Sequence, residues 1–148
     1  MKPIVALMTA ALVAFGTLTT PVVAADMIMV RVDTPGICGH SAVLGKITSR
    51  FRHQVKHVPH LPLVDIDDFY HIGESRYLPQ REDQPIERRY CHAKVALSDG
   101  RSRDIYYLIE KPMGFAGVGS NVEFCVSGFD RWNVYGARCR SVRPPRTS

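Results

Sequence analysis

The sequence predicts an α+β domain in which one amphipathic helix packs on a three- to four-stranded antiparallel sheet. Three observations support this class: apolar residues recur at helical spacing from Leu44 to Val58, apolar and polar residues alternate after Pro85, and cysteines are spread through the same region. A change of apolar period from about 3.6 to about 2 marks the change from helix to strand. A helix followed by a run of strands is the order expected of an α+β fold.

The helix is predicted from five apolar positions. At 100° per residue they fall within about 80° of the helix circumference. They are Leu44, Ile47, Phe51, Val55 and Val58. Ser41 is a suitable N-terminal cap, and Pro59 and Pro62 end the helix. The segment from there to Pro85 is rich in proline, glycine and charge, which predicts a long connection with a short strand near 63–66.

Three strands are predicted after this connection. Apolar residues alternate with polar ones over 91–97 and again over 104–110, and a Ser-Asp-Gly turn separates the two runs. The third strand covers 121–127 and follows a glycine-rich loop that carries Phe115. Farther on, an aromatic and apolar segment predicts a last short strand or a packed turn; its residues are Trp132, Val134 and Tyr135.

Strand alternation favours one pairing of the cysteines. Four cysteines allow three pairings. Cys91 points to the side on which the helix lies, and Cys38 immediately precedes that helix. Cys125 points to the opposite side, where the C-terminal segment with Cys139 can reach it. The favoured pairs are therefore Cys38–Cys91 and Cys125–Cys139, and the other two pairings stay open.

Residues 1–25 differ in composition from the rest of the chain. Lys2 precedes an uncharged apolar run, and small residues at Val23 and Ala25 suit a cleavage site, as in a secretory signal peptide. An uncleaved anchor is the weaker interpretation, because the run is shorter than the roughly 20 residues that cross a bilayer. We expect 26–148 to be a single disulfide-bonded domain with a basic C-terminal tail, periplasmic or secreted, without a transmembrane segment after cleavage.

Several short motifs group this chain with other sequences. They are Arg89-Tyr90-Cys91, Asp99-Gly100, Tyr106-Tyr107-Leu108-Ile109-Glu110, Gly114-Phe115-Ala116, Asn121-Val122-Glu123-Phe124-Cys125 and Cys139-Arg140-Ser141. With them the chain resembles a group of small exported proteins of alphaproteobacteria, especially rhizobia and their relatives. The resemblance covers the C-terminal part of the chain and the segment from Cys38 into the helix. It implies a shared scaffold and a periplasmic location, but it transfers no activity and no site residue.

Charge patterning marks the candidate binding surfaces. The chain holds 19 Lys and Arg against 14 Asp and Glu, a formal net charge of +5, which favours an anionic partner. The candidate binding residues are Lys46, Arg50, His53 and His57 on the polar face of the helix, Phe115 in the glycine-rich loop, and Arg138 and Arg140 in the tail. A solvated helix face, a loop folded onto the core and a solvated tail are the simpler alternatives.

His53 and His57 also raise the question of a metal. Their i,i+4 spacing can place two imidazoles on one ion. The neighbouring charges of Lys46 and Arg50 oppose a divalent ion, although copper or zinc could still compete. No motif calls for a cofactor, and none is expected.

Catalysis has little support in the sequence. There is no G-x-S-x-G or H-E-x-x-H motif, and oxidation of all four cysteines would leave no nucleophilic thiol. Nucleic acid is not an expected partner of an exported protein. The sequence therefore favours a protein that binds an anionic envelope component or another periplasmic protein. A small periplasmic hydrolase and a copper or zinc carrier using the histidine pair are the alternatives.

Overall fold

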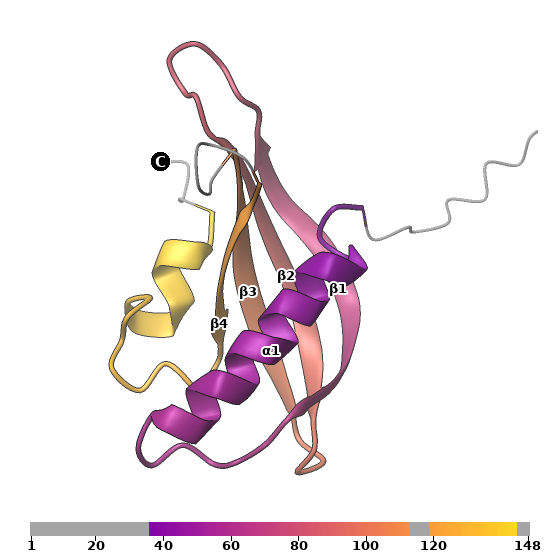
Figure 1. Cartoon of the computed structure of the whole chain (residues 1–148), viewed down its shortest axis with the longest axis vertical. Helices are drawn as coiled ribbons and strands as arrows, with labels where there is room; N and C mark the ends of the chain where they lie inside the picture. The colour runs from indigo at the N-terminus through magenta and orange to yellow at the C-terminus, as the bar shows by residue number, and fades with distance from the viewer. Residues whose placement is uncertain (1–35, 113–118, 145–148) are drawn as a thin grey trace, which may run out of the picture. The chain divides into compact units, whose positions relative to one another are not determined.

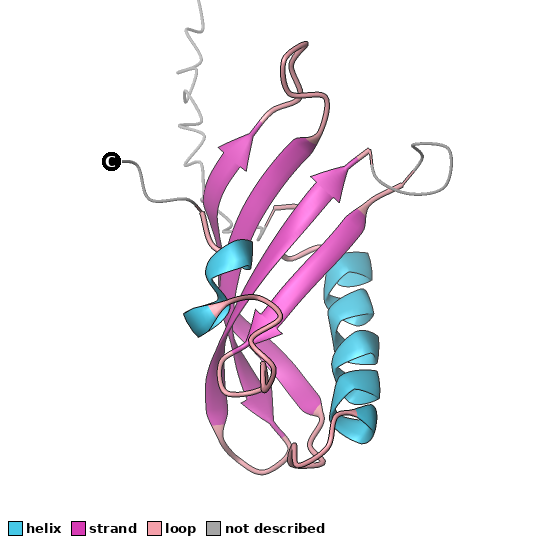
Figure 2. Cartoon of the chain, turned by 90° about the vertical axis from the view of Figure 1, so that its left-hand side faces the viewer, coloured by secondary structure: helices cyan, strands magenta, loops and turns pink. Residues whose placement is uncertain are grey.

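The computed structural model describes residues 36–112 and 119–144. Its elements are α1 (Ser41–His57), β1 (Ile66–Leu78), β2 (Glu87–Leu97), β3 (Ser102–Lys111), β4 (Asn121–Val126) and the 3₁₀ helix η2 (Ala137–Val142). The strands form one antiparallel sheet in the order β1-β2-β3-β4. Helix α1 covers one face of the sheet and η2 lies on the other (Figures 1 and 2). The predicted α+β class is thus confirmed.

The main core lies between α1 and the inner face of the sheet. From the sheet it takes alternate residues of β2 and β3, among them Val95, Ile105 and Tyr107, none of which is exposed to solvent. The buried residues of the helix are Val43, Ile47, Phe51 and Val55. Ile47, Phe51 and Val55 are therefore buried as predicted. Val43 is buried in place of Leu44, which is half-buried. Residues four apart line up along one helix face, and this face contacts the sheet.

The N-terminal cap of α1 differs from the prediction. Ser41 is the first helical residue, and His40 is the cap. The His40 backbone is extended, and its Nδ1 atom accepts a hydrogen bond of 3.3 Å from the amide of Ala42. A cap must stand outside the helix to turn its side chain back onto the first turn, and here that position is one residue earlier. At the other end α1 stops at His57, before Pro59, as predicted.

The predicted long connection is wrong over most of its length, because it contains β1. This 13-residue strand pairs with β2 from Ile66 to Leu78. Three irregularities in the pairing, between Ile66 and Asp68, Tyr70 and Gly73, and Glu74 and Arg76, shift the alternation of side chains. An edge strand with bulges loses the regular period of two, so the alternation of apolar and polar residues does not predict β1.

The segment after β4 follows the prediction only in part, because it forms turns and not a short strand. It forms turns and then η2, and it does not pack all its apolar side chains: Trp132 is 62% exposed and Val134 is 71% exposed. Only Tyr135 contacts the small outer core. That core is formed where η2 meets the outer face of the sheet, and its buried members are Tyr90, Leu108, Cys125, Cys139 and Val142.

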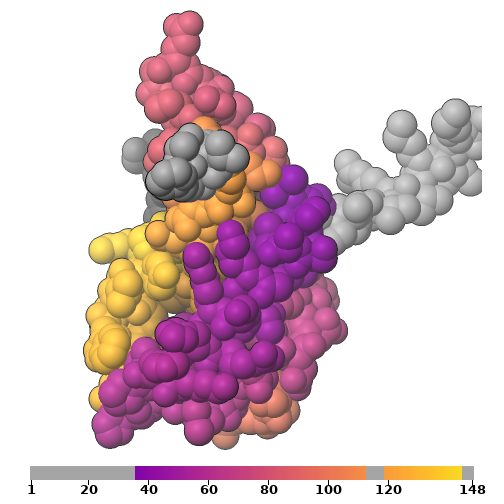
Figure 3. Space-filling view, in the orientation of Figure 1, coloured from indigo at the N-terminus to yellow at the C-terminus, as the bar shows by residue number. Residues whose placement is uncertain are grey.

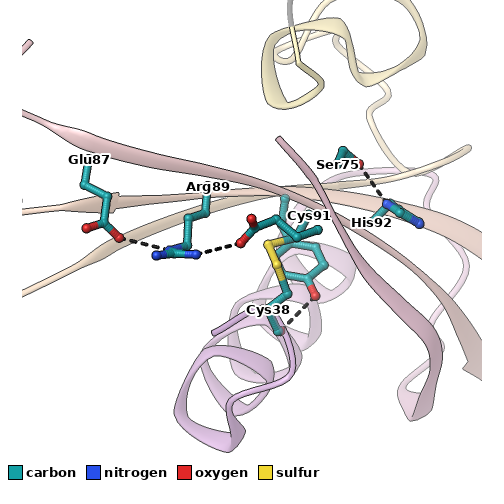
Figure 4. The surroundings of a disulfide bond; sticks show 8 residues. Cys38, Ser75, Glu87, Arg89, Cys91 and His92 are labelled. Carbon is teal, nitrogen blue, oxygen red and sulfur yellow. Dashed lines mark hydrogen bonds and ion pairs between the residues drawn. A yellow bond between two sulfur atoms is a disulfide. The ribbon is translucent and has the colours of Figure 1, made fainter. Parts of the chain in front are cut away.

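Both favoured disulfides are present. Cys38–Cys91 joins the start of α1 to β2, and Cys125–Cys139 joins β4 to η2 on the opposite face. All four cysteines of the chain are therefore paired. Beside the first bridge, the buried hydroxyl of Tyr107 donates a hydrogen bond of 2.8 Å to the carbonyl of Cys38 (Figure 4). In the described residues no helix is both long and apolar enough to span a bilayer.

Replacing each disulfide by a pair of serines should destabilise the fold unequally. The sequence separations are 53 residues for Cys38–Cys91 and 14 for Cys125–Cys139. Loop-closure entropy then predicts losses of about 4 and about 3 kcal/mol in the free energy of unfolding. Urea denaturation followed by circular dichroism measures both. A larger loss for the Cys125/Cys139 variant would contradict the entropic explanation.

Tyr107 should make the fold sensitive to alkali. Burial raises the pKa of its phenol well above the ordinary value of 10.0, so the folded state keeps a proton that the unfolded state releases. Stability contributed by this group is complete below pH 10 and falls as the pH rises further, by at most about 1.4 kcal/mol per pH unit. The Tyr107→Phe variant should show a shallower decline above pH 10 in urea titrations. An unchanged slope would contradict this assignment.

Candidate functional site

A hollow on the outer face lies between η2 and the sheet. It has a volume of about 820 Å³. Its lining residues are Ser75, Tyr90, Tyr106, Ala137, Arg138, Arg140, Ser141, Arg143 and Pro144. Three arginines thus surround it, and none of these lining residues is acidic. We call this hollow the arginine pocket.

The Cys125–Cys139 disulfide positions the arginines of this pocket. Cys139 and Val142 turn inward onto the sheet and are almost fully buried, whereas Arg138 and Arg140 are exposed. Arg138 and Cys139 both have a left-handed backbone with φ of 59°, a conformation that non-glycine residues rarely adopt. The amide of Ser141 donates to the carbonyl of Tyr135 at 3.0 Å, which helps to hold this turn. Buried and exposed side chains are thereby fixed on opposite sides of η2.

The guanidinium groups are spread around the pocket. That of Arg143 lies over the ring of Tyr106, 4.6 Å from its centroid, which is a cation–π contact. The side chain of Arg140 folds back beside Gly136, which comes directly before η2. Arginine presents a planar fork of donors that matches carboxylate and phosphate groups. With no acidic residue lining the pocket, these donors can bind an anion.

On the β1 side, the pocket meets a serine–histidine pair. Ser75 Oγ lies 2.8 Å from Nδ1 of His92 (Figure 4). The His92 ring packs against Gly73 of β1, where an added Cβ would lie 2.7 Å from Cε1 of the ring. Gly73 is therefore needed for the ring to take this position, and the pair fixes the Ser75 hydroxyl at the pocket.

Another arginine, Arg89 on the inner face, is already paired with carboxylates. Arg89 donates at 2.7 Å to Glu74 and at 3.0 Å to Glu87, and its guanidinium lies 3.8 Å from the ring centroid of Tyr77. Figure 4 shows Arg89 with Glu87, to one side of the Cys38–Cys91 bridge. Two carboxylates on one guanidinium leave little attraction for an external anion, so this cluster ties β1 to β2.

The four candidate binding residues on the polar face of the helix separate into two groups. Lys46 donates at 3.1 Å to the carbonyl of Ser120, and Arg50 at 2.7 Å to that of Val122. Gln54, one turn farther along the helix, donates a hydrogen bond of 2.9 Å to the carbonyl of Phe129. These three side chains therefore follow the free edge of β4 and satisfy carbonyls there. The positive charges of Lys46 and Arg50 are directed at the sheet edge.

His53 and His57 lie in solvent, as the sequence predicts. Their rings stack with centroids 3.9 Å apart, and His57 Nδ1 lies 2.7 Å from the carbonyl oxygen of His53. A carbonyl only accepts, so this Nδ1 carries a hydrogen and only Nε2 of His57 is left for a metal. In the described part of the chain, no three His, Cys, Asp or Glu side chains gather as a metal site. A metal at the pair stays a prediction.

The remaining candidates divide between the pocket and the segments outside the described residues. Arg138 and Arg140, both predicted, line the arginine pocket. Phe115 and the expected signal peptide lie outside the described residues. Arg143 belongs to the basic tail for which the sequence predicts an anionic partner, whereas Tyr106 and Ser75 were not predicted as site residues. The outward position of Tyr106 could have been read from the strand alternation, whereas the return of the tail onto that face depends on the disulfide.

Comparison with known proteins found no matching family model, no similar curated protein and no similar solved structure. The resemblance to exported alphaproteobacterial proteins therefore stays a prediction. Any functional conclusion has to come from the chemistry of the site.

The edge contacts of α1 should be measurable in a matched pair of variants. Arg50→Met removes a charged hydrogen bond to a backbone carbonyl and should lower the free energy of unfolding by about 1–2 kcal/mol. Arg52→Met, on the same helix, removes only an exposed ion pair with Asp65 and should cost about 0.5 kcal/mol or less. Urea denaturation distinguishes them. An equal or larger loss for Arg52→Met would contradict the edge contact.

Proposed function

We propose that this protein is an exported binding protein that recognises an anionic component of the cell envelope through the arginine pocket. The observation that carries the proposal is the set of three arginines around a pocket whose described lining has no carboxylate. Arg138, Arg140 and Arg143 can pair with phosphate or carboxylate groups of a headgroup or polysaccharide. The hydroxyls of Ser75 and the lining tyrosines add hydrogen-bonding partners for such a molecule.

The paired cysteines support the part of the proposal that places the protein outside the cytosol. Paired cysteines persist in oxidising compartments such as the periplasm, and this chain pairs all four. The signal-peptide pattern of residues 1–25 agrees with export.

The size of the pocket argues for an extended ligand. A volume of about 820 Å³ lies within the range of roughly 300–1,000 Å³ typical of small-molecule sites. It exceeds the space that one inorganic anion needs. Because the guanidinium groups lie apart, one beside Gly136 and another over Tyr106, a ligand with more than one anionic group would use them best.

Charge reversal in the pocket should weaken binding to anionic envelope material. In a vesicle sedimentation assay with phosphatidylglycerol, Arg140→Glu should bind at least tenfold more weakly than the natural sequence. The reason is that an arginine that would pair with the lipid phosphate is replaced by a carboxylate that repels it. The matched control is Arg81→Glu, an equal change of charge in the connection between β1 and β2, outside the lining of the pocket. Phosphatidylcholine vesicles should not bind. Competition by inorganic phosphate or by polygalacturonate distinguishes phosphate from carboxylate recognition.

Two results would contradict the proposal. The first is equal weakening by Arg140→Glu and Arg81→Glu, which would mean that net charge and not the pocket drives binding. The second is the failure of phosphatidylglycerol, inorganic phosphate and polygalacturonate alike to bind the natural sequence.

A further inference from the structure

A second hollow lies on the other side of the C-terminal segment, between it and α1. Figure 3 shows this hollow between the indigo-to-magenta helix and the yellow segment. Its volume is about 290 Å³. The lining residues that matter here are Phe129, Trp132, Val134 and Tyr135, together with Arg50 and Arg131. We call this hollow the tryptophan groove.

The groove is bordered by apolar side chains that the fold leaves in water. Trp132 and Val134 are 62% and 71% exposed, and both line the groove. Exposed tryptophan is typical of the residues that dominate binding energy at protein interfaces. The deeper wall is Phe129, which is 3% exposed and packs edge-on against Phe51 with ring centroids 5.0 Å apart. The groove thus has an exposed apolar border and a closed aromatic wall.

The loop that presents these side chains is held in place by hydrogen bonds. The two carboxylate oxygens of Asp130 accept from the amides of Val134 at 2.8 Å and of Tyr135 at 2.9 Å. Gln54 of α1 fixes the carbonyl of Phe129 at 2.9 Å. A preformed groove loses little conformational entropy when a partner enters. Local hydrogen bonding therefore keeps Trp132 and Val134 exposed in one arrangement.

The charges around the groove favour an acidic occupant. Of the charged residues that line it, Arg50 and Arg131 are positive and Asp130 is negative, so the lining keeps a net positive charge while the Asp130 carboxylate accepts bonds from two backbone amides. Lys56 and His57, in the last turn of α1, precede the lining residue Val58. A second copy of this chain is disfavoured, since each copy has a formal net charge of +5.

We propose that the tryptophan groove docks an acidic segment of a partner protein and takes one bulky apolar side chain from it. A volume of about 290 Å³ suits a single anchoring side chain and is small for a drug-sized ligand. A recessed apolar site also fits an inserted side chain better than it fits a flat membrane surface. This site is separate from the arginine pocket and does not depend on it.

Trp132 is the only tryptophan of the chain, so its fluorescence reports directly on the groove. The oxidised protein is titrated with the synthetic peptide acetyl-Glu-Asp-Phe-Glu-Asp-amide. We expect a saturable change in tryptophan emission. Replacing the central Phe of the peptide by Ala should weaken binding at least tenfold, and so should exchanging its acidic residues for Lys and Arg.

Variants assign the binding to the groove. Arg131→Glu should weaken binding of the acidic Phe peptide at least tenfold, and Arg81→Glu, an equal charge change in the β1–β2 connection, should leave it unchanged. Arg140→Glu should also leave it unchanged, so failure of the groove and failure of the arginine pocket are distinguishable.

Four results would overturn the proposal. They are no saturable response to the acidic Phe peptide, equal binding of the Ala peptide, an emission change that depends on protein concentration without peptide, and a change produced by phosphatidylglycerol vesicles but not by the peptide. The third would assign the groove to self-association and the fourth to a membrane surface.

Discussion

The alternation of side chains across the sheet is the constraint on which the rest of the structure depends. Because neighbouring residues of a strand point to opposite faces, Cys91 of β2 faces α1 while Cys125 of β4 faces η2. Each face is therefore joined by a disulfide to the segment that covers it. A small sheet buries limited apolar surface by itself, so these covalent connections stabilise both layers. The inner layer forms the main core, and the outer layer carries the arginine pocket.

The two edges of the open sheet are protected differently. At β4, the side chains of Lys46, Arg50 and Gln54 satisfy carbonyls of β4 and its flanking residues. At β1, irregular pairing and the left-handed backbone of His71, with φ of 52°, interrupt the regular ladder. Both devices discourage pairing with further strands. Lys46 and Arg50 therefore also have a structural role at the sheet edge, and the exposed arginines around η2 form the arginine pocket.

The sequence was sufficient to predict elements whose apolar residues keep a regular period. The helix, three of the strands and both disulfides follow from such patterns, with Cys91 and Cys125 assigned by alternation alone. Strand β1 was missed because its bulges break the period and much of its surface is exposed. For the pocket, the arginines of the tail were predicted but Tyr106 was not. The contact of Arg143 with Tyr106 joins the tail to β3, and a local pattern contains no information on such a contact.

The sheet is a stable platform, and the outer disulfide holds the arginines of the pocket in place on it. The most direct test is anion binding by the Cys125→Ser/Cys139→Ser variant, with amide hydrogen exchange measured on the same sample. We predict that β1 to β4 keep their exchange protection, that the amides at position 139 and of Ser141 lose theirs, and that binding to phosphatidylglycerol vesicles falls at least tenfold. Undiminished binding, or loss of protection throughout the sheet, would contradict this account.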